Sequence, residues 1–396
     1  MKILMISSFL PFPLYSGGHI RLYNLIKNLS KSNEITLICE KRDNQAQQDI
    51  EEVKKICKKV ITVKREKQWS AKNIIKTGIS SNPFLVVGHT SIEMTLLIKD
   101  ELVREKFDLI HVETFYVFQN LPKVTIPIVL AEHNIEYLVY KKYADLANPL
   151  IKPLLLLDIA KIKKAEEFYW QKADKLIAVS NLDKKEMKRE DVVVIPNGVD
   201  TKKFRFRDFQ NIPEEKKVLF IGDFKWIQNR DAVEFILKEI WPKVKKELAE
   251  LNKNLNLKLW IVGRNLPQSF KQFTAQDIIF DEKNKQETED IFRKSFILLA
   301  PLRVAGGTSY KILEAMSSGV SVVTSSLGIE SLEVKNGVHV LAADKADELA
   351  NCVVDLATDG SLYKTLVHNS RNFVEEKFDW SIISDKLNKV YMSAAK

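Results

Sequence analysis

Hydrophobic positions along this chain alternate between short apolar runs and longer stretches with helical spacing. Residues 2–7 predict a buried strand, residues 18–29 an amphipathic helix, and residues 34–39 a second strand. Further apolar runs predict strands at 60–63, 109–112, 128–131, 176–179 and 192–195. This alternation predicts a parallel sheet covered by helices on both faces.

The pattern restarts after the turn signal Pro196-Asn197-Gly198. A strand is predicted at 217–221 and an amphipathic helix at 231–246. Later apolar runs predict strands at 257–262, 278–280, 297–300, 320–324 and 338–341. We therefore expect two α/β domains with a hinge near residues 200–206.

Composition agrees with two folded domains. The chain has 396 residues, too many for one ordinary core, and 45% of them are hydrophobic. No signal peptide or membrane-spanning run is evident, so we expect a cytoplasmic protein. The three cysteines, Cys39, Cys57 and Cys352, match no metal-ligand spacing, which predicts buried thiols in a reducing compartment and no metal site.

Two predicted strand ends of the first domain carry candidate ligand-binding residues. Gly17 and Gly18 precede the first helix, where paired glycines and helix N–H groups let a phosphate approach the backbone. His133 follows the strand at 128–131 and can donate a hydrogen bond to a sugar hydroxyl or a phosphate. The structural alternatives are a tight turn at the glycines and a histidine that caps its own loop.

The segment 300–316 joins a strand end to a helix start and carries the most information. Gly306 and Gly307 permit close approach of the backbone. Thr308 and Ser309 can cap the following helix, whose N–H groups favour a diphosphate.

Three charged residues flank this glycine loop. Arg303 and Lys311 bracket it with positive charge, and Glu314 can accept hydrogen bonds from the two hydroxyls of a ribose. The structural alternative is an i,i+3 ion pair between Lys311 and Glu314. Such a pair would require neither the glycines nor Arg303, so we favour a nucleotide diphosphate site.

With these residues in view, the chain resembles the group 1, family-4-type retaining glycosyltransferases of GT-B fold along nearly its whole length. The motifs occur in the family's order: Ala178-Val179-Ser180, Ile195-Pro196-Asn197-Gly198-Val199-Asp200, Phe220-Ile221-Gly222, Ile261-Val262-Gly263, and Leu313-Glu314-Ala315-Met316 with Gly319-Val320-Ser321-Val322-Val323. Pro301-Leu302-Arg303, Gly307-Thr308, Lys311 and Glu314 together resemble bacterial sugar transferases of exopolysaccharide loci.

The resemblance implies two Rossmann-like domains facing across a cleft. Residues 1–202 would take the acceptor, residues 203–377 the nucleotide sugar, and the helix at 378–396 would return to the first domain. The implied reaction transfers a sugar with retention from a UDP- or GDP-type donor to a glycan or lipid-linked acceptor, in polysaccharide or glycoconjugate synthesis. No metal or other cofactor is implied, and the sequence contains no DxD triplet.

Two positions depart from the family pattern. The first glutamate of the family's usual pair would fall at Gly306, and its basic pair after strand 217–221 would fall at Asp223 and Asn229. A leaving diphosphate still needs positive charge. The residues that can supply it are Lys225, Arg230, Arg303 and Lys311, of which we rank Arg303 and Lys311 first.

We predict that the ribose docks on Glu314 and the diphosphate at residues 306–309, beside Gly222. Gly17, Gly18 and His133 would complete the site from the first domain. The predicted catalytic residues are His133, Arg303 and Lys311. Stabilisation of the departing diphosphate is expected to contribute most to catalysis.

Two other functions suit the same architecture. A sugar-nucleotide epimerase would use Glu132 and Glu136 as acid and base. A catalytically silent scaffold would bind nucleotide without turnover. Asp223 and Asn229 favour this function, because they stand where the family has basic residues. The net charge of +9 also suits nucleic acid, but no aromatic-and-basic strand or recognition helix is evident, so we expect no nucleic-acid partner.

Residues around Trp69 suggest a peripheral membrane contact. Trp69 and the stretch 74–87 mix lysines with apolar residues in the first domain. Lys72 and Lys76 would be attracted to anionic lipid, with Trp69 and Phe84 anchored at the interface. The alternative is that these apolar residues belong to the domain's own core.

Overall fold

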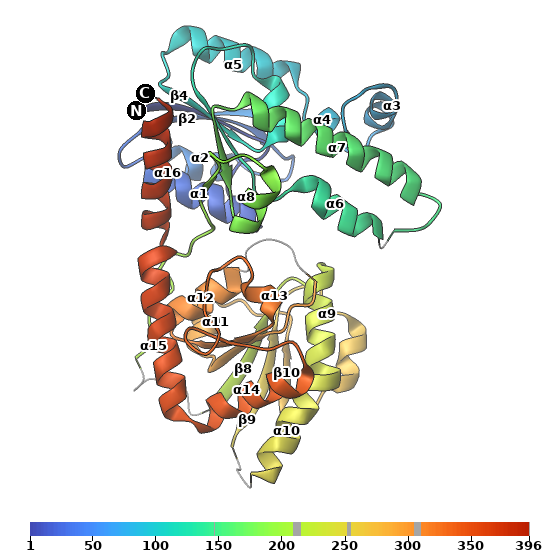
Figure 1. The fold of residues 1–396 in the computed structure, drawn as a ribbon, viewed down its shortest axis with the longest axis vertical. Helices are drawn as coiled ribbons and strands as arrows, with labels where there is room; N and C mark the ends of the chain where they lie inside the picture. Colours follow the sequence, from blue (N-terminus) through green and yellow to red (C-terminus); the bar gives the residue numbers. More distant parts are fainter. Residues whose placement is uncertain (146, 209–214, 252–254, 305–309, 396) are drawn as a thin grey trace. The chain divides into compact units, whose positions relative to one another are not determined.

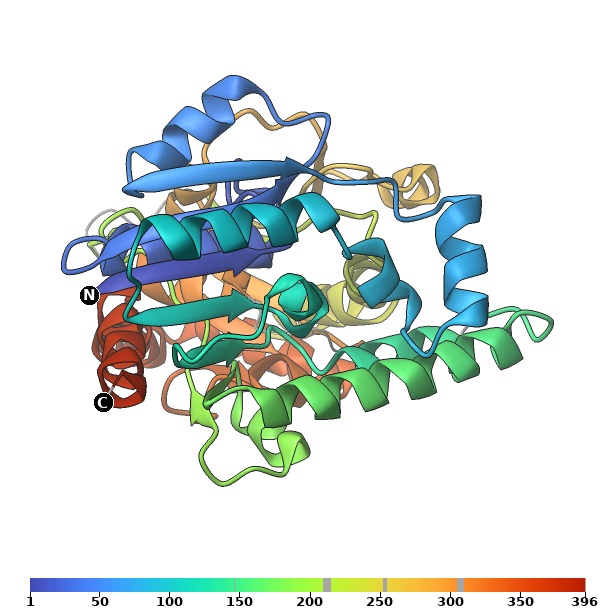
Figure 2. The same cartoon turned by 90° about the horizontal axis from the view of Figure 1, so that it is seen from above.

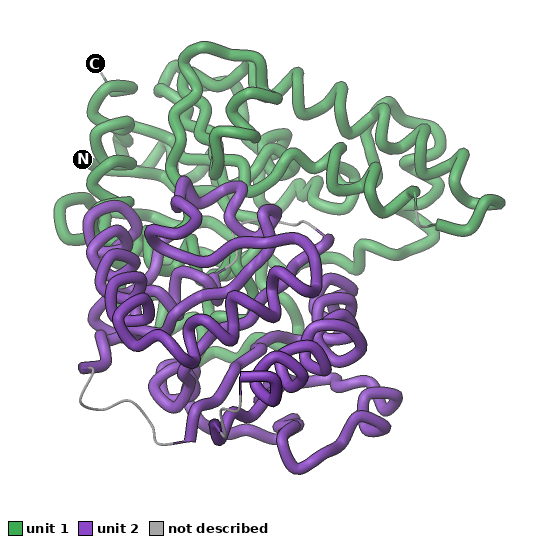
Figure 3. Tube along the Cα trace, turned by 60° about the horizontal axis from the view of Figure 1, so that its bottom comes forward, with its two compact units in different colours: residues 1–197, 380–396 green, residues 198–379 purple. Residues whose placement is uncertain are grey.

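The computed structural model describes residues 1–145, 147–208, 215–251, 255–304 and 310–395. They divide into two compact units (Figure 3): unit 1 is Met1–Asn197 with Trp380–Lys396, and unit 2 is Gly198–Asp379. The first division falls within the turn Pro196-Asn197-Gly198, whereas the sequence placed the domain limits after residues 202 and 377.

Unit 1 is built on a parallel sheet of seven strands in the order β3-β2-β1-β4-β5-β6-β7. The strands are β1 (Lys2–Ser7), β2 (Glu34–Lys41), β3 (Lys59–Lys64), β4 (Leu109–Glu113), β5 (Ile128–Ala131), β6 (Lys175–Ala178) and β7 (Val193–Val194). Each corresponds to a predicted apolar run. The order turns back between β1 and β4, which are paired from Ile3 with Leu109 to Ser7 with Glu113.

Helices cover this sheet and connect its strands (Figure 1). They are α1 (Gly17–Leu29), α2 (Gln47–Lys54), α3 (Ala71–Ile79), α4 (Phe84–Gly88), α5 (Ile92–Arg104), the 3-10 turn η1 (Phe115–Asn120), α6 (Glu136–Asp145), α7 (Lys152–Lys172) and α8 (Asn181–Met187). The last helix of the chain, α16 (Trp380–Ala394), packs against α1. The C-terminal helix therefore belongs to unit 1, as the family resemblance implies.

Unit 2 has a parallel sheet of six strands in the order β10-β9-β8-β11-β12-β13. They are β8 (Lys216–Ile221), β9 (Leu257–Val262), β10 (Ile278–Asp281), β11 (Ile297–Ala300), β12 (Ser321–Thr324) and β13 (Leu341–Ala342). The helical segments are α9 (Ile227–Phe235), η3 (Ile236–Ile240), α10 (Trp241–Glu250), η4 (Gln268–Phe273), α11 (Thr288–Arg293), α12 (Tyr310–Ser318), α13 (Ser326–Ile329), α14 (Ala346–Thr358) and α15 (Gly360–Lys377).

Two predicted elements of unit 2 have different limits. The helix expected at 231–246 begins at Ile227 and runs through the π-helical turn η3 into α10. Pro242 in the first turn of α10 has no N–H to continue the regular pattern, which explains the change of winding. The strand expected at 338–341 is reduced to Leu341–Ala342, because a turn in which the Val338 and His339 N–H groups donate to the Lys335 carbonyl occupies the start of that run.

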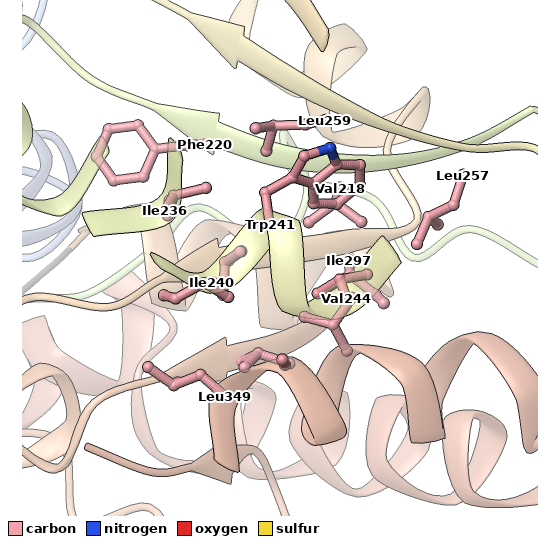
Figure 4. Close-up of a cluster of buried hydrophobic side chains, with 14 of the residues drawn as sticks. Val218, Phe220, Ile236, Ile240, Trp241, Val244, Leu257, Leu259, Ile297 and Leu349 are labelled. Carbon is pink, nitrogen blue, oxygen red and sulfur yellow. The ribbon is translucent and has the colours of Figure 1, made fainter. Parts of the chain in front are cut away.

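One hydrophobic cluster of unit 2 gathers around Trp241, whose side chain lies among Val218, Leu259 and Ile297 (Figure 4). Its indole Nε1 donates to Asp277 Oδ2 at 2.7 Å, so the ring is buried while its polar atom keeps a partner. This core fixes η3 and α10 against the sheet, and thereby positions α9, which precedes them.

The two crossings of the chain between the units lie side by side. Val199 N–H donates to Phe378 O at 2.8 Å, and the Thr201 hydroxyl donates to Asp379 Oδ2 at 2.5 Å. The segment that leaves unit 1 is thus paired with the segment that returns to it.

Candidate functional site

The candidate nucleotide site of unit 2 lies at the carboxyl end of β8. This strand is flanked by β9 on one side and β11 on the other, so the connections from β8 and β11 leave in opposite directions. Such a switch point opens a crevice at the carboxyl ends of the strands, where ligands of α/β proteins bind. Gly222 follows β8, and Arg303 follows β11.

Gly222 permits a close approach of α9 to the strand end. A Cβ at Gly222 would lie 2.7 Å from Nδ2 of Asn229, which is buried and donates to the Asp223 carbonyl. The neighbouring Gly263 has a φ of +149°, and a Cβ there would overlap the Gly222 carbonyl. Both glycines are therefore required for this close packing of backbone and side chain.

Lys311 on α12 reaches this strand end. Its Nζ donates to Asn229 Oδ1 at 2.9 Å and lies 4.4 Å from the centre of the Phe220 ring. Burial lowers the pKa of Lys311 to about 8, although Glu314 opposes the shift. Asn229 occupies a position where the family resemblance expects a basic residue, and it holds an ammonium group instead of supplying one.

Glu314 lies one turn beyond Lys311 on the same helix and is partly buried. Burial raises the pKa of its carboxyl group to about 7, while Lys203 and Lys311 act in the opposite direction. Within the described ranges, no salt bridge of 4 Å or less joins Lys311 to Glu314. The ion pair that would have explained both residues structurally is absent there.

Arg303 forms an ion pair that the sequence did not predict. Its Nε and Nη2 atoms donate to the two carboxylate oxygens of Asp231 at 3.0 and 2.7 Å. The guanidinium lies 4.3 Å from the Phe235 ring, and the hydrogen bond to Asp231 raises its pKa. Asp231 is two residues after Asn229, so both Arg303 and Lys311 are attached to α9.

The other two predicted cations lie at the start of α9 and are exposed. Lys225 Nζ is 3.6 Å from Asp223 Oδ2, and Arg230 Nη1 donates to the Phe224 carbonyl at 3.3 Å. Arg264 adds a third cation, 3.4 Å from Asp223 Oδ2. The predicted residues Gly306, Gly307, Thr308 and Ser309 lie outside the described residues.

In unit 1 the corresponding switch point lies between β1 and β4, and α1 begins beside it. Gly17 and Gly18 are the first residues of α1, after the extended Ser16. A Cβ at Gly18 would lie 3.3 Å from Nδ1 of His133 and 3.4 Å from the Phe9 ring. The structure thus brings together the two sequence motifs of the first domain.

Glu113, the last residue of β4, is a candidate site residue that the sequence did not reveal. It is 1% exposed, and its Oε1 lies 2.5 Å from Nε2 of His133. Its other carboxylate oxygen accepts a hydrogen bond from Nε2 of His111. Burial raises the pKa of Glu113, but the two histidines outweigh it and hold that pKa well below its ordinary value.

The carboxylates that an epimerase would need are placed differently. Glu132 is 1% exposed, and its oxygens accept from Trp170 Nε1 at 3.1 Å and from Phe115 N–H at 3.4 Å. Burial raises the pKa of Glu132 well above its ordinary value. Because Glu132 is enclosed among structural partners, it is unsuited to act on a substrate.

Trp69 and residues 74–87, predicted to contact a membrane, divide into two groups. Trp69 and Ile79 are 79% and 84% exposed, whereas Leu85 and Val86 are buried in the core of unit 1. The Phe84 ring lies 4.8 Å from the Trp69 ring and is only partly exposed. Among the described helices, none has the length and apolar content to cross a bilayer.

Two family models match the chain, one in each half. The model of Glycosyltransferase Family 4 matches residues 15–203, and that of Glycosyl transferases group 1 matches residues 215–359. The chain is also 22% identical over 395 residues to an "Uncharacterized 44.6 kDa protein in cps region" of Klebsiella pneumoniae, with 96% of each chain covered.

Solved structures show the same fold. Sucrose-phosphate synthase from Thermosynechococcus elongatus has a TM-score of 0.69 and 17% identity, with 99% of each chain covered. The HepE protein of Anabaena in complex with UDP has a TM-score of 0.66 and 15% identity, covering 99% of this chain and all of that one. The chain belongs to the group 1, family 4 glycosyltransferases, and it is a transferase with the two Rossmann-like domains of the GT-B fold.

Proposed function

We propose that this glycosyltransferase moves a sugar from a UDP- or GDP-type nucleotide sugar to an acceptor hydroxyl during polysaccharide or glycoconjugate synthesis. The supporting observation is the placement of Lys311 on Asn229 at the end of β8. Glu314 lies one turn further along the same helix, and among the described residues no salt bridge joins it to Lys311. The UDP bound by HepE and the cps-region relative favour this donor and this pathway class.

In the proposed reaction, the bond from the anomeric carbon to the diphosphate oxygen breaks and a bond to the acceptor oxygen forms. Lys311 and Arg303 stabilise the negative charge of the leaving diphosphate. The acceptor hydroxyl attacks the anomeric carbon from the face that the diphosphate leaves, and its proton passes to the departing phosphate oxygen. Attack on that face retains the configuration, and the scheme requires neither a nucleophilic side chain nor a metal. Glu314 accepts hydrogen bonds from the ribose hydroxyls.

The donor can be identified by thermal shift with UDP-, GDP-, ADP- and TDP-sugars, because a bound ligand stabilises the folded state by RT ln(1 + [L]/Kd). Nucleotide sugars of one of these bases should raise the Tm of the wild-type chain, and Glu314→Gln should reduce this rise in Tm. Glu348→Gln is a matched control, since Glu348 lies on the exposed face of α14, in another helix. Equal shifts in all three proteins would remove Glu314 from the nucleotide site.

A scaffold that binds nucleotide without turnover is the second candidate, and the ion pair between Arg303 and Asp231 favours it. A guanidinium already held by a carboxylate has less charge to offer a diphosphate. Release of nucleoside diphosphate from the matching donor, with glycan and polyprenyl-phosphate acceptors, separates the two. Nucleotide binding without release on any acceptor would support the scaffold.

For the acceptor, we propose a lipid-linked molecule reached through peripheral contact with an anionic membrane. The chemistry that favours it is a group of exposed apolar side chains with lysines among them, on α3 and the start of α7: Trp69, Ile74, Ile75, Ile79, Leu154 and Leu157, with Lys72 and Lys76. Lys161 of α7 donates to the Thr77 and Ser80 carbonyls, which holds α7 beside α3 (Figures 1 and 2).

Liposome flotation tests this membrane contact. Binding should appear on anionic vesicles, fall with added salt and weaken when Trp69, Lys72 and Lys76 are replaced by Ala, because each Lys near the surface contributes about 1 kcal/mol. A matched variant with Lys243, Lys245 and Lys246 replaced on α10 of unit 2 should bind as the wild type does. Equal recovery on neutral and anionic vesicles, or no flotation, would leave a soluble acceptor.

A further inference from the structure

Four side chains of unit 1 form a continuous hydrogen-bonded chain behind the candidate site. Tyr391 of α16 lies with its hydroxyl 2.8 Å from Nδ1 of His111, and Nε2 of His111 bonds to Glu113. The other carboxylate oxygen of Glu113 lies 2.5 Å from Nε2 of His133. Tyr391, His111 and Glu113 are all buried, while the His133 side chain is 16% exposed.

The direction of each hydrogen bond follows from the charge of Glu113. The two histidines keep this carboxyl ionised by lowering its pKa, and an ionised carboxylate can only accept hydrogen bonds. Both imidazoles must therefore carry a proton on Nε2. In the neutral form of His111, Nδ1 is then an acceptor that can take the hydrogen of the Tyr391 hydroxyl.

The same reasoning fixes the outer imidazole. In its neutral form, with Nε2–H donated to Glu113, His133 carries a lone pair on Nδ1, which lies against Gly18 in the first turn of α1. No described residue donates to that atom. It can accept a hydrogen bond from a ligand hydroxyl, whereas the sequence had suggested that His133 donates one.

Arg21 adds a fixed charge behind this carboxylate. Its Nε is 3.9 Å from Glu113 Oε1, and its Nη atoms donate to the carbonyls of Ile195 and Pro196. Arg21 is 1% exposed, so its charge is little screened by water. This cation further favours the ionised form of Glu113.

We infer that Glu113 is a positioning residue that holds His133 as the Nε2–H tautomer, with Nδ1 presented to a hydroxyl group of the donor or acceptor. The inference rests on the proposed transfer reaction only for its effect on rate. The tautomer itself is a property of the ligand-free chain. Tyr391 connects the C-terminal helix α16 to this hydrogen-bonded network, because its hydroxyl bonds to Nδ1 of His111.

The test is NMR of protein labelled with 15N-histidine, which distinguishes Nε2–H from Nδ1–H by two-bond couplings in the ring. The chain has six histidines, so His133→Ala identifies the signals of that residue. At a pH where His133 is neutral, we expect the Nε2–H form in the wild type and a mixture of tautomers in Glu113→Gln, since the amide offers an oxygen acceptor to one imidazole and an NH2 donor to the other. A wild-type His133 in the Nδ1–H form would overturn the inference.

Three variants separate positioning from loss of fold. Glu101→Gln removes a buried carboxylate elsewhere in unit 1, paired with Lys59, and should leave His133 unchanged. Tyr391→Phe should keep the His133 tautomer, because Glu113 remains. Glu113→Asp, which keeps the charge on a shorter side chain, replaces Glu113→Gln if the latter fails to fold, and should loosen His133 by lengthening its hydrogen bond.

Rates give an independent readout on the matching donor. Glu113→Gln should lower kcat/KM by roughly tenfold, because misdirecting the ring weakens the hydrogen bond that Nδ1 accepts from the substrate hydroxyl. An unchanged tautomer with an equal loss of rate would overturn the inference. Absence of turnover in the wild type would refute the proposed function and leave the tautomer result standing.

Discussion

The ammonium of Lys311 lies 2.9 Å from Oδ1 of Asn229, so a residue of α12 places its charge at the carboxyl end of β8. Asn229 fills the space that Gly222 leaves open, and its own amide is fixed by the Asp223 carbonyl. We propose that Lys311, 82 residues further along the chain, substitutes for the basic residue of the family pattern that is absent at this position.

Lys311→Ala should reduce transfer more than Arg303→Ala does. Loss of a charged group aimed at a leaving diphosphate costs on the order of 10²-fold in kcat. Arg303 already shares its charge with Asp231, so we expect a smaller loss, roughly tenfold. In both variants, binding of the nucleoside monophosphate, which lacks the second phosphate, should change less than kcat.

Lys225→Ala and Arg230→Ala are the matched controls for this comparison, since both cations lie exposed at the start of α9. Steady-state kinetics on the donor identified by thermal shift provide the measurement. A larger loss in these two variants than in Lys311→Ala would place the compensating charge on the loop after β8.

Glu314→Gln should weaken donor binding and lower kcat/KM by tenfold or more, about 1.4 kcal/mol, because an amide replaces one of the carboxylate oxygens that accept the ribose hydroxyls. The fold should be retained, since Glu314 forms no described salt bridge. Circular dichroism and Tm check the fold, and donor titration checks the affinity. Unchanged donor kinetics would exclude Glu314 from the site.

The dependence of kcat/KM on pH should be bell-shaped. Burial raises the pKa of Glu314 to about 7, so its carboxylate is lost as the pH falls through that value. Burial lowers the pKa of Lys311 to about 8, so its positive charge is lost as the pH rises through that value. Because kcat/KM reports the free enzyme, these two groups set its acid and alkaline limbs.

Two substitutions assign the limbs. Lys311→Arg should remove the alkaline limb, since a guanidinium stays protonated, and Glu314→Gln should remove the acid limb. In the kcat profile at saturating donor, the alkaline limb should move to higher pH because the diphosphate favours the charged lysine. Persistence of both limbs in both variants would assign them to other groups.

The strands were predictable because parallel strands covered on both faces are continuous apolar runs, as in Ile297–Ala300, where every residue is buried. Glycines at strand ends and the cations around them were predictable for the same local reason. Glu113 was not, because a single acidic residue at a strand end has no distinguishing pattern. Its partners His111, His133 and Tyr391 meet only after the sheet and α16 have assembled.

The partner of Arg303 was hidden for a related reason. Asp231 lies 72 residues earlier in the sequence, and only the packing of α9 beside the end of β11 brings the two together. Sequence reasoning predicted that a cation follows β11, but it could not predict that a carboxylate would hold it. The same limit applied to Lys311, for which the sequence offered Glu314 as the structural alternative to a diphosphate, and whose observed partner is Asn229.

Gly18→Ala should impair transfer while leaving the fold intact. A Cβ at this position would meet Nδ1 and Cε1 of His133 at 3.3 and 3.4 Å and the Phe9 ring at 3.4 Å. These contacts are tight, so the imidazole must move by a few tenths of an ångström, which disturbs its hydrogen bond to Glu113. We expect kcat/KM to fall by roughly tenfold, with little change in Tm.

Gly78→Ala is the matched control, because Gly78 lies in α3 and a Cβ there would meet nothing within 4 Å. Alanine is favoured over glycine in a helix by about 0.5–1 kcal/mol, so this variant should be slightly more stable and equally active. Kinetics and thermal melts of both variants provide the measurement. If Gly18→Ala behaves like Gly78→Ala in both assays, the packing of His133 against α1 has no part in the reaction.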